Sequence, residues 1–494
     1  MSGGFRSRSA GGDSNRGGAP KKSARPPRRA RQGGGRQRSK GPQQQDRRPV
    51  ERKDTGVDKP RVVAFDVLRR VNEDDAFANL TLPKLLKDRK ISGRDAAFAT
   101  ELTYGTLRTL GVLDTVIQEC SSRPLEQIAP EVLDALRLGV YQLLYTRVDD
   151  HAAVDTTVRL VESTGHVKAK GFANAIMRTV TRTPAAKWIE KLTPTGEIDA
   201  IAFRTAHPRW IAESFSRVLG LGELEEALAA DSERPIVHLA ARPGEMTAEE
   251  LALITGGEEG TYSPYAVYLE SGNPANVEPV KDGLATVQDE GSQLIARAAA
   301  EAPVEGEDAG RWLDLCAGPG GKAALMGALA RIDGARVDAV EISDHRAELI
   351  RRAVGDLPVT VHTADGRDPG LEPGYDRVLV DAPCTGLGAL RRRAEARWRK
   401  DETDVPGLNV LQYELLSSAL RLVRPGGVVV YSTCSPDLRE TRAVVDKAVA
   451  ELGATELDAH GLVPGMSDIG EDKSVQMWPH RHGTDAMFFA VLRR

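Results

Sequence analysis

Two of the four cysteines stand directly after apolar runs that are typical of buried strands. Cys384 closes the sequence DAPC after the run YDRVLVDA, and Cys434 lies in STCS after the run GGVVVYST. Each leaves its strand among turn residues and polar groups, where arginines and helix N-termini depress a thiol pKa. A thiolate is a nucleophile, so the pair is suited to covalent catalysis. Cys120 and Cys316 fit the commoner role of small buried side chains.

A glycine-rich loop links another apolar run to a helical pattern. Its glycines permit a tight turn without Cβ atoms, so that a ligand can approach the backbone and the next helix N-terminus. The pattern G-x-G-x-x-A, completed by Ala323, is the dinucleotide fingerprint, shared by nicotinamide enzymes and methyltransferases. A Walker A loop is excluded because Ala323 replaces its Ser or Thr. The loop residues are Cys316, Ala317, Gly318, Pro319, Gly320, Gly321 and Lys322.

Three acidic residues close apolar runs of the same region. Glu341 follows the glycine loop by about 20 residues, where a carboxylate accepts hydrogen bonds from ribose hydroxyls. Asp365, in TADGRD, is placed to meet an adenine, and Asp381 closes VLVDAPC. One such residue alone is usually a solvated loop carboxylate. Three strand ends of this kind together favour a nucleoside ligand.

Apolar runs alternate with helical patterns from residue 286 to residue 494. This alternation predicts an α/β Rossmann-like domain, in which a parallel sheet is covered on both faces. The C-terminal FFAVLRR is expected to form a last strand. The other predicted strands are 311–316, 337–342, 359–364, 375–382 and 426–433.

Upstream of this domain the periodicity is helical. Apolar stripes with three-to-four spacing, separated by short polar breaks, predict an all-helical domain over 58–185. Mixed helix and strand patterns over 197–285 predict a small α+β subdomain, which leaves a linker between the two.

The N-terminal segment has a different composition. Residues 1–57 are rich in Gly, Arg, Ser, Gln and Pro, and this composition predicts disorder. Residues 1–61 contain 18 Lys or Arg and 5 Asp or Glu, a net charge of +13, whereas the whole chain is at −4. A cationic tail on an acidic body indicates a polyanionic partner such as nucleic acid, although a solvated solubility tail is the simpler interpretation.

Targeting and metal signals are missing from the sequence. The N-terminus has no apolar signal-peptide core, and no apolar run is long enough to span a membrane. Four scattered cysteines without a CxxC pair predict neither a disulfide framework nor a metal site. We therefore expect a cytoplasmic protein with free thiols and no membrane association, and a monomer.

Two thiols beside a methyl-donor site have a chemical logic. C5 of cytosine is a poor nucleophile, but a thiolate that adds to C6 turns the ring into an enamine, so that C5 can take up a methyl group. A base must then remove the C5 proton before the thiolate is eliminated. An acid near N3, for which Asp381 is the candidate, would stabilise the adduct. The residues alone permit either cysteine to be the nucleophile.

These motifs together resemble the RsmB/Sun (Fmu) family of RNA cytosine-C5 methyltransferases. The resemblance rests on LDLCAGPGGK, the acid at Glu341, ADG, DAPCTGLGALRR and YSTCS. HRHGTDAMFFAVLRR resembles the closing strand of the family, with Ala486 in place of a glycine. LTYGTLR, LRLGVYQLLYT and KGFANAIMR resemble a NusB-like RNA-binding domain. HPRWIAE (207–213) is similar to the start of the intermediate subdomain of the family.

The resemblance implies a role for each site residue. Cys434 would be the covalent nucleophile, Cys384 would assist breakdown of the adduct, and Asp381 would contact the base near the cofactor. The loop from Cys316 to Lys322, with Glu341, Asp365 and Asp381, would hold S-adenosylmethionine. The fused NusB-like arrangement implies small-subunit (16S) ribosomal RNA as the substrate. The basic run LRRRAEARWRK (390–400) would supply phosphate contacts, with Trp398 stacked on a base or simply packed.

Three alternatives remain open at this point. A nicotinamide oxidoreductase would use the glycine loop but leaves DAPC and STCS unexplained. A non-catalytic RNA-binding or assembly factor would not need the intact cysteine pair and the cofactor acids. A third alternative keeps the chemistry and exchanges the roles of Cys384 and Cys434.

Overall fold

A computed structural model describes residues 53–270 and 272–494 of the chain. The basic tail expected at residues 1–57 therefore lies, as far as residue 52, outside the described residues. Within the described ranges, no helix combines the length and the apolar composition that crossing a membrane requires.

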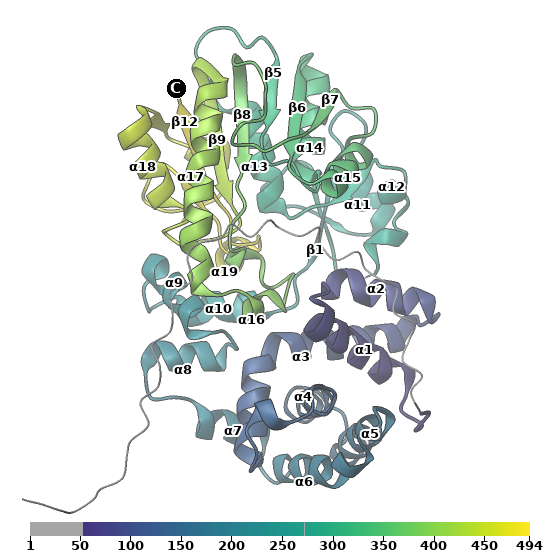
Figure 1. Ribbon diagram of the computed structural model, residues 1–494. Coiled ribbons are helices and arrows are strands. Elements are labelled where there is room, and N and C mark those ends of the chain that lie inside the picture. Colours follow the sequence, from purple (N-terminus) through teal and green to yellow (C-terminus); the bar gives the residue numbers. More distant parts are fainter. Residues whose placement is uncertain (1–52, 271) are drawn as a thin grey trace, which may run out of the picture. The chain divides into compact units, whose positions relative to one another are not determined.

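The first described domain consists of helices packed around one apolar core, drawn in purple and blue in Figure 1. Pro60 and Pro130 stand in the first turns of α1 and α4, where a missing N–H breaks no helical hydrogen bond. Trp188 of the last helix belongs to the same core, so the helical packing continues past residue 185. The helices are α1 (Lys59–Asp74), α2 (Ala78–Asp88), α3 (Gly93–Cys120), α4 (Pro130–Tyr145), α5 (Asp150–Ser163), α6 (Lys170–Val180) and α7 (Ala185–Leu192).

The middle region contains three helices followed by a small antiparallel sheet of order β2-β3-β1-β4. The helices are α8 (Glu197–Arg204), α9 (Arg209–Leu219) and α10 (Leu224–Ser232), and their apolar core also includes Leu387 and Leu390 from the last domain. The mixed composition predicted for this region is confirmed. The remaining elements are β1 (Val237–Ala241), α11 (Ala248–Thr255), β2 (Glu258–Glu259), β3 (Ala266–Leu269), α12 (Glu278–Lys281) and β4 (Ala285–Val287).

The last domain is built on a sheet of order β10-β12-β9-β8-β5-β6-β7, with β11 paired to β12. All six predicted strands are present, and the five from β5 to β9 run parallel. The C-terminal strand β12 is antiparallel to β9, so the sheet is mixed at this edge. The strands are β5 (Arg311–Asp314), β6 (Arg336–Glu341), β7 (Val359–Thr363), β8 (Tyr375–Asp381), β9 (Val423–Thr433), β10 (Thr455–Leu457), β11 (Val475–Gln476) and β12 (Phe488–Arg493).

Helices cover both faces of this sheet (Figure 1), as the near-continuous apolar runs predicted. On one face lie α13 (Glu290–Glu301), α14 (Gly321–Asp333) and α15 (Asp344–Val354). On the other lie α17 (Val405–Leu422) and α18 (Arg442–Leu452). The short helices α16 (Ala396–Arg399) and α19 (Pro479–His482) belong to the loops.

The strand order changes direction at β5, since β6 and β7 extend the sheet on one side and β8 and β9 on the other. In a doubly wound sheet, ligands bind at the carboxyl ends of the strands beside such a switch point. The glycine loop follows β5, and the two cysteines follow β8 and β9. The topology therefore brings all the predicted chemistry to one edge, which we call the carboxyl edge.

The basic segment 390–400 packs against the protein itself. Arg397 is fully buried and donates to the carbonyl oxygens of Ala206 and Asp231, both at 3.1 Å. Arg399 donates to the carbonyl oxygen of Val71, in the last turn of α1, and to that of Ala76, just after this helix. These two arginines donate to backbone carbonyl groups of the protein, so the prediction that they contact phosphates is wrong.

The same correction applies to the first two arginines of the segment. Arg391 Nε lies 2.6 Å from Asp485, and Arg392 Nη2 lies 2.7 Å from Asp289. Asp289 caps the start of α13 and Asp485 precedes β12. The run of positive charge could not disclose these partners because they come from distant parts of the chain. Arg393 remains exposed, and its guanidinium has no hydrogen-bond or ion-pair partner in the described part of the chain.

Trp398 packs against α3, which was the simpler of the two roles expected for it. Its indole Nε1 donates to the carbonyl oxygen of Leu107 at 2.7 Å. A Cβ atom added to Gly111 would lie 2.5 Å from Cη2 of the indole. The glycine therefore leaves room for the ring.

Gly111→Ala is expected to destabilise the protein by about 1–3 kcal/mol, because the new methyl group overlaps the Trp398 ring. Gly171→Ala on α6 is the matched control, since nothing lies within 4 Å of its added Cβ. The control should gain up to about 1 kcal/mol from the helix propensity of alanine. Urea unfolding followed by tryptophan fluorescence measures both. A Gly111→Ala protein as stable as the control would contradict the packing of Trp398.

Candidate functional site

The two strand-end cysteines face each other. Strands β8 and β9 are parallel neighbours, with Asp381 opposite Ser432. The chain leaves both strands at the carboxyl edge, and the Sγ atoms of Cys384 and Cys434 lie 3.4 Å apart. Both side chains are half-buried. The pairing of the thiols, which the sequence only suggested, is thus a direct contact.

Backbone hydrogen bonds hold the two loops together. The amide of Gly388 donates to the carbonyl oxygen of Cys434 at 2.9 Å, and the amide of Ala486 donates to the carbonyl oxygen of Gly388 at 2.9 Å. A Cβ atom added to Gly388 would lie only 1.8 Å from the carbonyl oxygen of Ala486. Glycine is required here because three chain segments meet at backbone distance.

The thiols differ in their acidity. The hydrogen bond with Cys434 and burial raise the pKa of Cys384 well above its usual range. The hydrogen bond from Cys384 lowers the pKa of Cys434, against burial and the charge of Asp381, and the charges of Lys322 and Arg393 lower it further. Cys434 is therefore the more acidic thiol of the pair. The more acidic thiol is the one more readily converted to a thiolate.

Lys322 and Asp381 form an ion pair next to the thiols. Lys322 Nζ lies 2.9 Å from Asp381 Oδ2, and Ser432 Oγ donates to Asp381 Oδ1 at 3.1 Å. Lys322 was expected only in the cofactor loop. The structure also directs its ammonium group to the acid that ends β8.

The glycine loop lies against the acid of the next strand. Glu341 is buried, accepts from the amide of Ser343 at 2.9 Å and pairs with Arg346 at 3.3 Å. A Cβ at Gly318 would lie only 2.2 Å from Glu341 Oε2. The loop and the carboxylate therefore form a narrow cradle that a side chain at this glycine would fill.

Asp365 stands at the same edge, after β7. Its carboxylate is engaged by Arg367 at 2.6 Å, and this hydrogen bond lowers the pKa of Asp365. A Cβ at the adjacent Gly366 would meet the carbonyl oxygen of Leu315 at 2.9 Å, so this loop approaches the end of β5 closely.

Asp314 is a site residue that the sequence reasoning missed. It ends β5 with no exposed surface, and burial and the charge of Asp381 raise its pKa to about 7. Its Oδ2 atom has no hydrogen-bond partner in the described part of the chain. Its position at the end of an apolar run, as for Asp381, was the signal that could have found it. Cys316, two residues on, has a pKa raised well above its usual range by burial and by the Asp314 charge.

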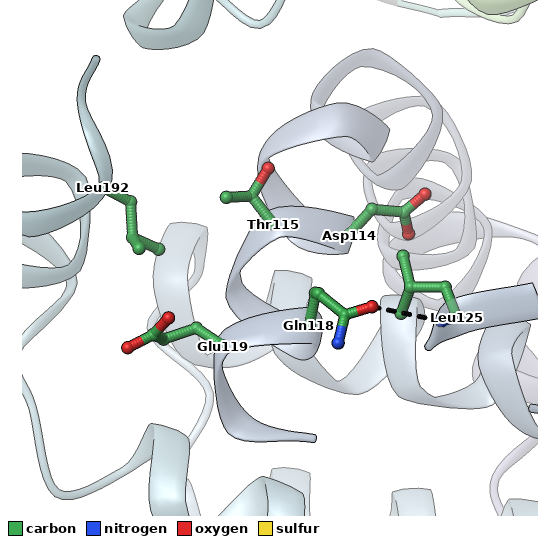
Figure 2. Close-up of a pocket in the computed structure, with 6 residues that line it drawn as sticks. All are labelled: Asp114, Thr115, Gln118, Glu119, Leu125 and Leu192. Atoms are coloured by element: carbon green, nitrogen blue, oxygen red, sulfur yellow. Dashed lines mark hydrogen bonds between the residues drawn. The ribbon is translucent and has the colours of Figure 1, made fainter. Parts of the chain in front are cut away.

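The helical domain carries a hollow away from the carboxyl edge. This hollow of about 360 Å³, shown in Figure 2, contains none of the predicted site residues. It is lined by Asp114, Thr115, Gln118, Glu119, Leu125 and Leu192. In the described ranges, His, Cys, Asp and Glu side chains form no group of three or more that could hold a metal ion.

A doubly wound sheet with a glycine cradle, strand-end acids and a thiol pair defines an α/β enzyme of the class that binds a nucleoside cofactor. Comparison with known proteins gives the family. Residues 300–493 match the family model described as 16S rRNA methyltransferase RsmB/F, and residues 58–182 match the NusB family. The chain belongs to the RsmB/F family of methyltransferases and carries a NusB-family domain.

Relatives match over nearly their whole lengths. A Mycobacterium tuberculosis (strain H37Rv) protein described as a methyltransferase is 56% identical over 89% of this chain and 97% of its own length. Ribosomal RNA small subunit methyltransferase B of Klebsiella pneumoniae (strain 342) is 32% identical over 87% and 97%. The crystal structure of PH0851 has a similar fold, with a TM-score of 0.74, 22% identity and coverage of 88% of this chain and 99% of that chain.

Membership of this family decides against the first two alternatives and does not bear on the exchange of the roles of Cys384 and Cys434. The chain is a methyltransferase, so the nicotinamide oxidoreductase interpretation is set aside. The predicted family and fold class, a NusB-like helical domain, a small α+β part and a Rossmann-like methyltransferase domain, are confirmed.

Cys384→Ala is expected to raise the pKa of Cys434, because the thiolate loses the hydrogen bond that stabilises its charged form. The thiolate is the form that reacts with iodoacetamide, so the pH midpoint of Cys434 alkylation should move upward. Lys322→Met should shift it in the same direction by removing a nearby positive charge. Peptide mass spectrometry after alkylation across pH 6–10 measures the midpoint. An unchanged or lower midpoint in both variants would contradict the stated causes of the lowered pKa of Cys434.

Proposed function

We propose that the protein methylates C5 of a cytosine in small-subunit (16S) ribosomal RNA, with S-adenosylmethionine as methyl donor and through a covalent bond between Cys434 and C6. The observation that carries this proposal is the thiol pair, 3.4 Å apart at the carboxyl edge. A methyltransferase that acts on a nucleophilic atom needs no thiol. Methylation of a poorly nucleophilic pyrimidine carbon needs a nucleophile at C6 and a base at C5, and a thiol pair can fill both roles.

The cradle at Gly318 and Glu341 fits S-adenosylmethionine. A buried carboxylate at the end of β6 can accept from ribose hydroxyls, and the glycines admit a ligand to the backbone. The residues that would hold the cofactor are the loop from Cys316 to Lys322 with Glu341, Asp365 and Asp381. When bound, S-adenosylmethionine supplies the methyl group that C5 takes up. The crystal structure of NSun6 from Pyrococcus horikoshii with SFG has the same fold, with a TM-score of 0.51.

Cys434 begins the reaction. Its thiolate sulfur forms a bond to C6, and the electron pair of the C5–C6 double bond moves to C5, which becomes nucleophilic. Asp381 contacts the base, and the ammonium group of Lys322, bonded to Asp381, stabilises negative charge that develops on the ring.

Cys384 completes the reaction after methyl transfer. The hydrogen bond and charge of Cys434 that raise the pKa of Cys384 end once the Cys434 sulfur is bonded to carbon. Cys384 then releases its thiol proton to solvent, and its thiolate takes the proton from C5. The freed electron pair restores the C5–C6 double bond, and the S–C6 bond breaks with its pair returning to Cys434.

RNA as the substrate is supported by the NusB-family domain over residues 58–182 and by relatives named for ribosomal RNA methylation. The cationic tail is suited to phosphate contacts, which do not depend on sequence. We infer that the protein acts in the cytoplasm, where ribosomal RNA is found, and as a monomer, because the proposed site is complete within one chain.

Cys384→Ala should trap a covalent protein–RNA adduct, because the adduct forms but its C5 proton is not removed. Cys434→Ala should form none, and its methyl transfer should fall by at least about 10³-fold with the loss of the nucleophile. Denaturing gel electrophoresis with labelled 16S RNA and S-adenosylmethionine reads out both. An adduct in Cys434→Ala alone would exchange the cysteine roles.

Bisulfite mapping of ribosomal RNA from cells with and without the protein tests the function as a whole. We expect one 5-methylcytosine in 16S RNA to disappear with the protein and to return with the wild type, but not with Cys434→Ala. An unchanged map would overturn the proposed function.

Arg393 is the arginine of the 390–400 segment that is available for a phosphate contact. It is exposed, and its charge acts on Cys434. Arg393→Ala should raise the KM for RNA and reduce the salt dependence of RNA binding by about one counterion. Arg352→Ala, at an exposed arginine of α15, is the control and should change neither. Equal effects of both variants would argue against a specific contact.

A further inference from the structure

Two buried side chains grip the backbone on either side of Cys384. Glu440 Oε1 accepts from the amide of Thr385 at 2.9 Å, and Glu440 Oε2 accepts from the hydroxyl of the same threonine. On the preceding side, Gln412 Nε2 donates to the carbonyl oxygen of Pro383 at 2.9 Å. Gln412 Nε2 also donates to Glu440 Oε1 at 3.1 Å. The two peptide groups that flank the cysteine are thus held by one connected pair.

Glu440 is a carboxylate without exposed surface. Its side-chain partners in the described part of the chain, Thr385 and Gln412, are uncharged. Burying a charge is costly unless each oxygen is well satisfied by hydrogen bonds. Both oxygens of Glu440 meet this condition through Thr385 and Gln412, so these bonds fix the position of the side chain.

The same pair connects the loop of Cys384 to that of Cys434. The backbone of Glu440 accepts from the hydroxyl of Tyr431 on β9 at 2.7 Å. The hydroxyl groups of Thr385 and Ser435, each one residue after a cysteine, lie 3.2 Å apart. A shift of Glu440 would therefore move Cys384 relative to the strand that carries Cys434.

We propose that Glu440 and Gln412 are positioning residues, which hold the sulfur of Cys384 at the distance from the Cys434 adduct that proton removal from C5 requires. This inference rests on the proposed function, in which Cys384 breaks down the adduct. Glu440 and Gln412 form no hydrogen bond with either thiol, and they hold Cys384 through the backbone of residues 383–385 and the hydroxyl of Thr385.

The negative charge of Glu440 has a second consequence for the same step. After the hydrogen bond with Cys434 and burial, the charges of Cys434 and Glu440 are the next causes that raise the pKa of Cys384. The contribution of Cys434 ends in the adduct, but that of Glu440 persists. A thiolate beside a fixed negative charge is the stronger base. The same charge opposes release of the thiol proton, so the role of Glu440 in this step rests on the hydrogen bonds that it accepts.

The test uses Glu440→Gln and Gln412→Met in the full-length protein with Cys384 intact. The first variant retains the shape but removes the charge and replaces one of the two acceptor oxygens by an amide NH2 group, which can only donate. The second retains the volume and removes both amide hydrogen bonds. With 16S RNA and S-adenosylmethionine, we expect each to accumulate the covalent adduct at least about tenfold over the wild type and to lower kcat by a similar factor. The KM for RNA and the Kd for S-adenosylmethionine should stay within about twofold, because neither residue belongs to the cradle.

Matched controls separate positioning from general destabilisation. Glu290 is also a fully buried glutamate, and its Oε1 accepts from the amides of Tyr262 and Ser263 at 2.7 and 2.8 Å. Gln293 is a buried glutamine that donates to the carbonyl oxygen of Gln288 at 2.9 Å. Glu290→Gln and Gln293→Met should change stability without accumulating the adduct.

Each outcome decides between the two levels of the proposal. If Cys384→Ala traps no adduct, the proposed division of roles fails, whatever the other variants do. If Cys384→Ala traps the adduct but Glu440→Gln and Gln412→Met do not, the positioning role is refuted and the proposed function stands. Adduct in the control variants at the same level would also refute it. If Glu440→Gln no longer binds S-adenosylmethionine, and so is not folded, Gln412→Met decides.

Discussion

Parallel pairing of β8 with β9 is the interaction on which the rest of the site depends. The register that sets Asp381 opposite Ser432 brings both strands to the carboxyl edge at the same level, and the chain then turns into its two cysteine-bearing loops. A shift of one residue would turn the side chains to the opposite face of the sheet. The sulfur–sulfur contact, the ion pair of Lys322 and the approach of Gly388 to Cys434 all follow from this one alignment.

Charge around the thiol pair is arranged asymmetrically. Asp381 acts on both thiols, but Lys322 and Arg393 act on Cys434, whereas Glu440 acts on Cys384. Two chemically identical side chains in contact thus acquire different proton affinities from the residues around them. Such a division is typical of sites in which one group must react as a nucleophile while its neighbour keeps a proton.

Local sequence predicted the strands, the glycine loop and the three strand-end acids, because the pattern that indicates each of them lies within a few consecutive residues. It predicted the family from motifs in consistent order. It did not predict which residues distant segments contribute. Glu440 and Gln412 lie in sequence without a recognisable motif, but they bond to the backbone on either side of Cys384. The arginines at 391, 392, 397 and 399 failed as predicted RNA contacts for the same reason, since their partners lie far away in the chain. Asp314 was missed although its strand was found.

Arg399 has a consequence for how the chain is made. The carbonyl oxygens of Val71 and Ala76, at the end of α1, receive their hydrogen bonds from this arginine, and the backbone amide of Ala78 is bonded to Glu395. During synthesis the helical domain emerges first, and N-terminal domains generally begin to fold as they emerge. More than 300 further residues must then be synthesised before Arg399 and Glu395 can bond to the ends of its first two helices. Until the methyltransferase domain has been translated, these backbone groups are bonded to water in place of Arg399 and Glu395.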